Sequence, residues 1–426
     1  MRLLLILLAC LATTAAAQVP DSSFIRRALR IHRQVPMIDA HNDLPWEIRT
    51  RFGNSLDRAD LSRDLSDSIH TDIPRLRAGG VGAQFWSLWS TTQVARTQGP
   101  TVILEQIDLV KRMERRWPDV FVPARTADDI ERAHRQGKVA SLMGVEGGDY
   151  MRNSIGVMRT FFELGARYMT LTWNATLPWV DAASDTLARR GLTPFGREVV
   201  REMNRLGMMV DISHVSPTTM SHVLQVTESP VIFSHSSARG LADHRRNVPD
   251  SILRLMPRNG GVVMVNFYCD FVDSARIRHN NERAAFIRNV REGAMARSQD
   301  TAVVFAEIRR ATAQFDSTRP APRPGLGIMA DHIEHIRNVA GVDHVGYGSD
   351  YDGIDCAPEG LEDVSTFPRL TAELLRRGWS ENDVKKVVGL NMLRVMRENE
   401  RIAARLRRER PPFDGTIGQL DSGIVR

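Results

Sequence analysis

The chain contains few cysteines, 3 in 426 residues, and one of them, Cys10, lies in the apolar segment at the N-terminus. The other two, Cys269 and Cys356, are too few for a small scaffold held together by several disulfides. Neither lies in a recognisable motif of a cysteine nucleophile. The sequence leaves open whether these two cysteines are bonded to each other.

Lysine is also scarce and occurs only as Lys111, Lys138, Lys385 and Lys386. The formal net charge is +6, and it comes from arginines that are interspersed with acidic residues along the chain. Because no basic stripe with interleaved aromatic residues is present, we predict no nucleic-acid partner. After the N-terminus no segment reaches the roughly eighteen apolar residues that cross a bilayer, so we predict no transmembrane segment.

Motifs of several common enzyme classes are missing as well. The chain has no glycine-rich dinucleotide turn, no phosphate-binding loop and no Gly-x-Ser-x-Gly nucleophile motif. Apolar residues make up 42% of the chain and charged residues 25%, which is typical of a soluble globular protein. The length suffices for one large domain or two ordinary ones.

The N-terminus has the pattern of a cleaved signal peptide over residues 1–17. A short positive start is followed by "LLLILLACLA" and then by "TTAAAQVP", which offers an Ala-x-Ala site before Gln18. The apolar run is too short to span a bilayer. We therefore predict a periplasmic or secreted protein; a lipoprotein signal ending at Cys10 is the alternative.

Short apolar runs rich in Val, Ile and Met alternate with segments of helical period. The runs are mostly continuous, as expected for strands that are buried on both faces of a parallel sheet. Thr126 before "ADDIERA" is a typical helix cap. Helices are predicted between the strands at residues 101–116, 126–136, 154–165, 194–206, 217–227, 249–258 and 327–340. The predicted strands are residues 35–39, 81–89, 139–145, 168–173, 207–213, 230–234, 261–267 and 344–348.

Eight strands that alternate with helices predict an α/β fold of the (β/α)₈ TIM-barrel type. A doubly wound open sheet is the alternative, although it would usually carry a glycine-rich dinucleotide turn. Residues 271–325 are polar and arginine-rich and end in "STRPAPRPG", which indicates an insertion after the seventh strand with an extended proline-rich end. Extra helices are predicted over 363–377 and 380–397. The barrel domain is expected to cover 18–400, followed by a charged tail over 401–426.

Residues that bind metals well follow five of the predicted strands. In a barrel of this type the carboxyl ends of the strands and the loops after them form the active site. These side chains are therefore expected to meet at one rim. They are His41 and Asp43 after the first strand, Glu146 after the third, Asp211 and His214 after the fifth, His235 after the sixth, and Asp350 and Asp352 after the eighth.

Imidazole and carboxylate groups suit two Zn²⁺ ions, and a carboxylate can bridge two metals. We expect His41 and Asp43 to bind one ion, His214 and His235 to bind the other, and Glu146 to lie between them. Paired metals activate a shared water and polarise a carbonyl group for attack. Such a centre is typical of hydrolases.

Two other motifs are interpreted as unrelated to this centre. "DHIEHI" at 331–336 has its histidines three residues apart, whereas a zincin helix needs His-Glu-x-x-His, so we expect His332 and His335 on a helix surface. "DYDGID" at 350–355 resembles a calcium loop, but its glycine comes too early and its last acid is out of register.

Eight segments, in order, closely resemble the membrane (renal) dipeptidase family of zinc peptidases. They are "DAHNDLPW", "GVEGG", "RLGMMVDISHVS", "PVIFSHSSAR", "RRNVPD", "VVMVNFY", "DYDG" and "PEGLEDVS". The resemblance runs over residues 35–398. It implies a (β/α)₈ barrel of the amidohydrolase type with two zinc ions per chain, hydrolysis of dipeptides and, because members are often dimeric, a homodimer.

The resemblance implies the same five metal ligands and the bridging role of Glu146. Arg246 in "HRRNVPD" matches the arginine that binds the free carboxylate of the substrate, a task that suits a planar guanidinium. Asp350 matches an acid near the two metals that binds the substrate's amino group or moves a proton to the leaving amine. Glu146 and Asp350 are therefore the expected catalytic residues.

One position departs from the family pattern. In "TLTWNATLPW" Trp173 stands where the family has a histidine that is thought to contact the reacting carbonyl oxygen. An indole can donate one hydrogen bond but cannot become a cation, so Trp173 is expected to contact the substrate in a different way. We expect an exported dizinc dipeptidase in which a metal-bound hydroxide attacks the peptide bond. The alternatives are another amidohydrolase-type reaction, on a lactam or an N-acyl amino acid, and a non-catalytic binding barrel.

Overall fold

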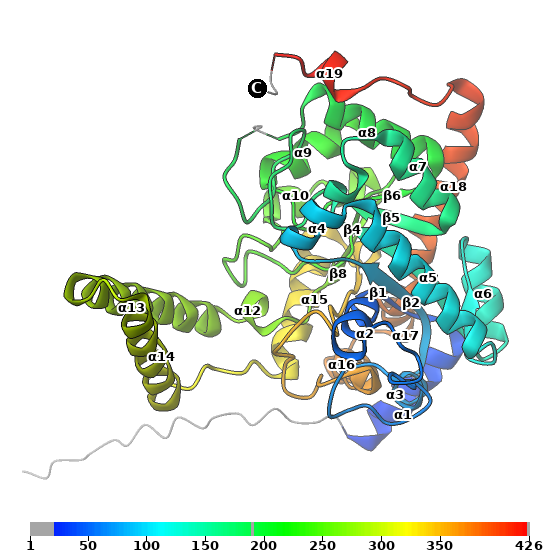
Figure 1. The fold of residues 1–426 in the computed structure, drawn as a ribbon. Helices are drawn as coiled ribbons and strands as arrows, with labels where there is room; N and C mark the ends of the chain where they lie inside the picture. Colours follow the sequence, from blue (N-terminus) through cyan, green and yellow to red (C-terminus); the bar gives the residue numbers. More distant parts are fainter. Residues whose placement is uncertain (1–20, 189–190, 424–426) are drawn as a thin grey trace, which may run out of the picture.

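The computed structural model describes residues 21–188 and 191–423 (Figure 1). The predicted signal peptide lies outside these residues. In the described part of the chain, a nine-stranded parallel sheet forms the centre of the molecule. Its strands are β1 (Met37–Asn42), β2 (Val81–Leu88), β3 (Phe121–Pro123), β4 (Val139–Glu146), β5 (Ala166–Thr170), β6 (Met209–Asp211), β7 (Ile232–Phe233), β8 (Val262–Val265) and β9 (Val345–Tyr347).

Eight of these strands close into a barrel, because β2 pairs with β4 as well as with β1. The order around the ring is β1, β2, β4, β5, β6, β7, β8, β9, and β9 pairs with β1 at Asp39 and Tyr347. The predicted (β/α)₈ fold is confirmed, and the eight predicted strands correspond to this ring. β3 was not predicted; it pairs with the first residues of β4, from Phe121 opposite Val139 onward, and is not part of the ring.

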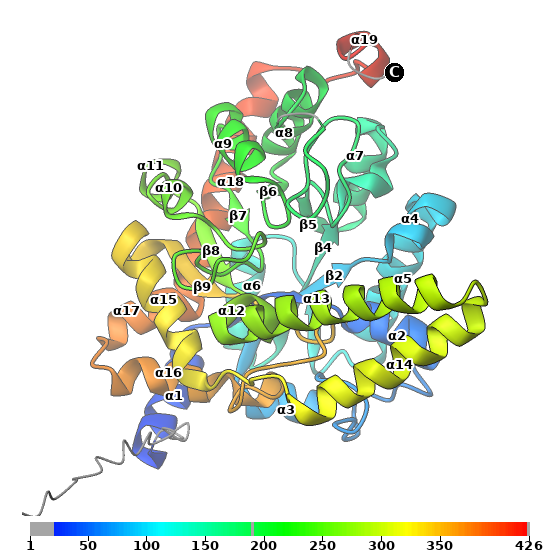
Figure 2. The ribbon, with the colours of Figure 1, turned by 90° about the vertical axis from the view of Figure 1, so that its left-hand side faces the viewer.

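Helices precede, separate and follow the strands of the ring (Figures 1 and 2). The predicted helices between strands are present, whereas the long helices over 274–297 and 301–318 were not predicted. They and the shorter helices are α1 (Ser22–Gln34), α2 (Leu44–Phe52), α3 (Ile73–Ala78), α4 (Thr92–Gln98), α5 (Pro100–Arg116), α6 (Ala127–Arg135), α7 (Ile155–Leu164), α8 (Pro194–Leu206), α9 (Pro217–Val226), α10 (Asp250–Leu253), α11 (Met256–Asn259), α12 (Cys269–Val272), α13 (Ser274–Arg297), α14 (Thr301–Thr318), α15 (Leu326–Ala340), α16 (Phe367–Arg376), α17 (Glu381–Lys385), α18 (Asn391–Glu409) and α19 (Ile417–Leu420).

Two predicted helices are divided in the structure. Residues 249–258, predicted as one helix, form α10 and α11, because Pro257 has no backbone N–H to donate to the preceding helical turn. Residues 380–397 contain α17, a π-helix over Lys386–Leu390 and the start of α18.

The apolar core has an inner and an outer part. The inner part fills the barrel with alternate residues of the strands, including Ile38, Phe85, Leu142, Tyr168, Ile232 and Met264. Met392 and Met396 of α18 belong to the same inner cluster, and Gly389, just before α18, lies against Pro36 before β1. α18 therefore closes the barrel at the amino ends of its strands.

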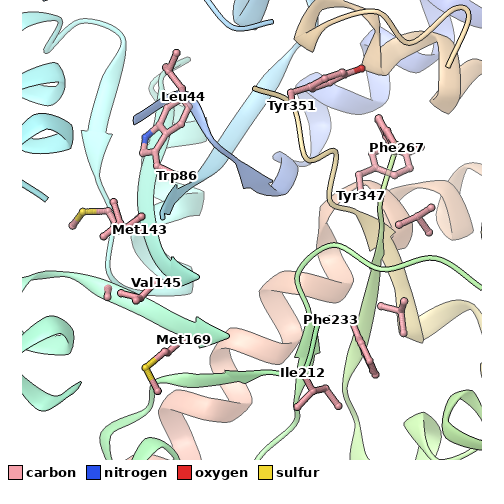
Figure 3. Close-up of a cluster of buried hydrophobic side chains, with 14 of the residues drawn as sticks. Leu44, Trp86, Met143, Val145, Met169, Ile212, Phe233, Phe267, Tyr347 and Tyr351 are labelled. Atoms are coloured by element: carbon pink, nitrogen blue, oxygen red, sulfur yellow. The ribbon is translucent and has the colours of Figure 1, made fainter. Parts of the chain in front are cut away.

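The outer part of the core lies between the strands and the helices. Figure 3 shows Trp86, Val145, Met169 and Phe233 on the strands of this layer. Fully burying a side chain such as Val, Leu, Phe or Met stabilises the fold by about 1.5–3 kcal/mol. Apolar side chains cover both faces of the sheet. The sequences of its strands are therefore continuous apolar runs and do not alternate with polar residues.

Residues 271–325 contain more regular structure than the predicted polar insertion. α13 and α14 form a hairpin that stands out from the barrel beyond α12 (Figure 1). Phe286 and Phe315 contact each other between the two helices, with ring centroids 5.1 Å apart, and Arg283 forms an ion pair with Asp316. Because the helices pack mainly on each other, α13 buries little more than Ala294 and lacks the wide apolar stripe that reveals a helix in a sequence.

Cys269 and Cys356 form a disulfide, with their Cα atoms 5.6 Å apart. It joins the start of α12, after β8, to the loop after β9, and the backbone N–H of Cys269 also donates to the carbonyl oxygen of Cys356. The two cysteines are 87 residues apart in sequence. The chain between them contains the α13–α14 hairpin and α15.

The C-terminal segment is attached to the barrel. α18 continues past residue 400, to Glu409, and further on the carboxylate of Asp421 accepts hydrogen bonds from Thr193 Oγ1 at 2.6 Å and from the N–H of Phe195 at 3.1 Å. Within residues 21–188 and 191–423, no helix has both the length and the hydrophobicity that crossing a membrane requires.

Candidate active site

His41 reaches the barrel interior because β1 is irregular near its end. Ala40 belongs to the inner apolar cluster, and His41 contacts Tyr168 of the same cluster, so two consecutive side chains face inward. The register between β1 and β2 shifts between Asp39 and Asn42, and a shift of this kind redirects a side chain. Asp43 follows at the start of α2, and its carboxylate does not cap that helix. Both predicted ligands therefore point into the site.

Glu146, at the end of β4, lies between two groups of ligand atoms. Its Oε2 is 3.3 Å from His41 Nε2, which is 3.4 Å from Asp43 Oδ2. Its Oε1 is 2.8 Å from His214 Nε2 and 3.4 Å from His235 Nε2. The two oxygens of one carboxylate thus face two different sets of residues.

The histidines offer the same ring nitrogen to the site. The hydroxyl of Tyr168 donates to the carbonyl oxygen of Ala40, so it accepts the Nδ1 proton of His41 at 2.9 Å. Ser234 donates to a carboxylate and accepts the Nδ1 proton of His235 at 2.8 Å. Because Nδ1 carries the proton in each ring, Nε2 has a free lone pair.

His214 is held in the same way by Asn174, whose side-chain oxygen lies 3.2 Å from Nδ1. Burial, with a contribution from the positive charge of Arg246, lowers the pKa of His214 to about 3. Burial also lowers the pKa of His235 well below its usual value. Both imidazoles are therefore neutral near pH 7, which is the form that binds metals.

These residues fit a pair of divalent cations. His41, Asp43 and Glu146 offer ligand atoms within 4.8 Å of one another, and so do Glu146, His214 and His235. In the described part of the chain, His41 Nε2 and Asp43 Oδ1 are buried without a hydrogen-bond partner. Buried polar atoms are seldom left unpaired in folded proteins, and a bound cation would satisfy both.

Asp350 lies beside this cluster, with Oδ1 4.0 Å from His41 Nε2. The side-chain amide of Asn266 donates to its other oxygen at 2.7 Å. Burial raises the pKa of Asp350 to about 8, and the nearby carboxylates of Asp43 and Glu146 add to the rise. Asp350 and His214 have φ angles of 66° and 65°, a region that non-glycine residues seldom adopt and that is frequent at functional sites.

Arg246 lies next to His235 and is 2% exposed. Its guanidinium donates to the carbonyl oxygen of His235 at 3.2 Å and to Ser236 Oγ at 3.3 Å, and it stacks over Phe271. Burial lowers its pKa to about 10, so it remains a cation near neutral pH. In the described part of the chain its Nε is buried without a hydrogen-bond partner, so the guanidinium can bind an anionic ligand.

Sequence reasoning missed the residues that orient the ligands. Tyr168, Ser234 and Asn174 carry no metal-binding signal of their own, since their role follows from the single histidine that each of them contacts in the folded chain. Asp211, expected among the metal-type residues of the rim, points elsewhere: its carboxylate accepts hydrogen bonds from Thr170 and Ser234 and from the N–H groups of residues 213 and 234.

The other acidic and histidine motifs are structural. Asp352 accepts a hydrogen bond from the N–H of His70 and does not join the groups of ligand atoms. His332 was expected on a helix surface, and this is wrong: it is fully buried, accepts from the N–H of Ala238 and donates to a carbonyl oxygen. His335 bonds to Asp250 on the outside of the barrel.

We predict that Tyr168→Phe weakens zinc binding by about 10–100-fold, because the Nδ1 proton of His41 loses its acceptor. Competition with a chromogenic chelator measures this affinity. Tyr347→Phe is the matched control, since that hydroxyl contacts Thr371 away from the cluster. Equal zinc affinities of wild type and Tyr168→Phe would show that the hydroxyl does not orient His41.

The family model described as membrane dipeptidase (peptidase family M19) matches residues 25–410. The chain belongs to the membrane dipeptidase family. As a member it is a metallopeptidase of the dipeptidase type. Dipeptidase 3 of Mus musculus is 38% identical over 387 residues, which cover 90% of this chain and 68% of the mouse protein.

Solved structures share the membrane dipeptidase fold. The probable dipeptidase PvdM from Pseudomonas aeruginosa has a TM-score of 0.77 at 21% identity, covering 90% of this chain and 100% of that one. A metallopeptidase from Rhodobacter sphaeroides, solved with a phosphinate mimic of the dipeptide L-Ala-D-Ala, has a TM-score of 0.69 at 23% identity, covering 86% and 99%. At these identities the two structures support the fold alone.

Proposed function

We propose that the protein is an exported dipeptidase that uses two zinc ions. The position of Glu146 carries this proposal, because its two carboxylate oxygens face two separate sets of ligand atoms. His41 and Asp43 would hold one ion, and His214 and His235 the other. When bound, the two ions would activate water and polarise the carbonyl group of the scissile bond.

Arg246 and Asp350 would bind the two charged ends of a dipeptide. The buried guanidinium of Arg246 is rigid and cationic, so it would bind the free carboxylate and limit the substrate to short peptides. The carboxyl of Asp350 would hold the amino group or pass a proton to the leaving amine, since it lies beside the ligand atoms, with Oδ1 4.0 Å from His41 Nε2. The match to the membrane dipeptidase family supports this substrate class.

Two features support export. The N-terminal segment has a signal-peptide pattern, and the Cys269–Cys356 disulfide is typical of an oxidising compartment such as the periplasm or the outside of the cell. The homodimer implied by the family resemblance is part of the same proposal, and sedimentation analysis of the mature protein would test it.

Removal of metal is expected to abolish hydrolysis of a dipeptide such as Ala-Ala, and added Zn²⁺ should restore it with two ions bound per chain. Mg²⁺ is the control addition and should fail, because imidazole ligands suit zinc and not magnesium. Metal content and the rate of dipeptide hydrolysis are measured on the same samples. A metal-free preparation with full activity would refute the proposal.

A further inference from the structure

A cavity of about 780 Å³ opens above the candidate metal cluster. A cavity of this size is typical of a small-molecule site and has room for substrate side chains. Three tryptophans line it, each after a different strand: Trp46 in α2 after β1, Trp89 after β2 and Trp173 after β5.

The three indole rings form one continuous surface, called here the tryptophan wall. The ring centroids of Trp46 and Trp89 are 5.1 Å apart, and those of Trp89 and Trp173 are 4.9 Å apart, both in edge-to-face geometry. Trp173 in turn lies 6.4 Å from the ring of His214. The wall therefore extends from α2 to the edge of the metal cluster.

The middle of the wall is held firmly. The side chain of Gln106 accepts a hydrogen bond from the backbone N–H of Trp89 at 3.1 Å and donates one to its carbonyl oxygen at 2.6 Å. Gln106 itself is fully buried in α5. A fixed aromatic surface binds an apolar group without the cost of ordering its own side chains.

Arg246 lies across the barrel from the wall. It follows β7, and in the ring β7 is opposite β2, the strand before Trp89. A dipeptide whose carboxylate binds Arg246 and whose peptide bond lies over Glu146 would therefore direct its N-terminal residue toward the wall. Its amino group would lie near Asp350, beside β1.

We propose that the tryptophan wall binds the side chain of the N-terminal residue and makes the enzyme selective for dipeptides with a large aromatic residue there. This inference rests on the proposed dipeptidase function. An aromatic side chain buries a large apolar area and gains edge-to-face contacts with a wall of this kind. Trp173 is thus a specificity-determining residue.

The wild-type enzyme provides the first test. We expect kcat/KM for Phe-Gly to exceed that for Ala-Gly by about 10-fold, the size of effect that one apolar pocket gives. Gly-Phe should gain no such advantage over Gly-Ala, because its aromatic residue lies on the Arg246 side. Equal rates for Phe-Gly and Ala-Gly, or a preference for Lys-Gly over Phe-Gly, would overturn the inference.

Variants of the wall provide the second test. The quantity to compare is the ratio of kcat/KM for Phe-Gly to that for Ala-Gly. Trp89→Ala should lower this ratio by about 10-fold, and Trp173→His should lower it by a smaller factor. Trp117→Phe is the control, since Trp117 packs near Phe121 outside the cavity and should leave the ratio unchanged. An unchanged ratio in both wall variants contradicts the inference while Ala-Gly turnover still supports a dipeptidase. A wild-type enzyme that hydrolyses none of these dipeptides would instead contradict the proposed function.

Discussion

Glu146→Gln is expected to reduce dipeptide hydrolysis by a factor on the order of 10³ and to lower the bound metal from two ions per chain to one or none. The substitution keeps the shape of the side chain but replaces one oxygen by an amide NH₂, which cannot bind a cation. Since one oxygen faces His41 and the other faces His214, one of the two sets loses its shared ligand in either amide orientation. Elemental analysis and a dipeptide assay on the same sample measure both effects.

Glu163→Gln is the matched control, because Glu163 is an exposed residue of α7. It should retain the metal and the activity of the wild type. A Glu146→Gln protein that binds two ions and hydrolyses dipeptides at the wild-type rate would exclude a bridging role for this carboxylate.

Gly353→Ala is expected to cost about 100-fold in activity, although residue 353 carries no functional side chain. A Cβ atom at this position would overlap Asp43 Oδ2 and lie 2.8 Å from Asp350 Oδ1. Both carboxylates would have to move, and a displacement of about 1 Å in an active site can reduce the rate by about 10². The zinc affinity should fall with the rate, and both are measurable in one titration series.

Gly156→Ala serves as the control for a glycine substitution, since a Cβ there would meet Ser154 Oγ at an ordinary 3.5 Å. Thermal unfolding of both variants shows whether a substitution disturbs only the active site or destabilises the whole fold. A Gly353→Ala enzyme with wild-type zinc affinity and rate would mean that the loop after β9 adjusts without disturbing the two carboxylates.

The positions of the metal-type residues could be predicted because the fold has a simple rule. In a parallel barrel all carboxyl ends lie at one rim, so His41, Glu146, His214 and His235 had to be close together once their strands were recognised. The continuous apolar runs revealed those strands, since both faces of the ring are covered. The five expected ligands are indeed brought together, while their binding of zinc stays a prediction.

The remaining features depend on contacts that no local pattern encodes. Tyr168 and Asn174 act through a single hydrogen bond each, and their partners lie 127 and 40 residues away in sequence. β3 is short and ends in Pro123, a residue that usually argues against a strand. His332 is buried because its face of α15 packs on the loops after β7 and β8, which the spacing of its motif could not show.

The Cys269–Cys356 disulfide makes the α13–α14 hairpin part of a covalently closed ring of the chain. A protease that cuts the short connection between the two helices, at residues 298–300, would open this ring without releasing a fragment. The piece that carries β1 to β8 and the piece that carries β9 with Asp350 would stay linked through sulfur. An enzyme nicked in this exposed arm would therefore keep both halves of its active site together for as long as its surroundings remain oxidising.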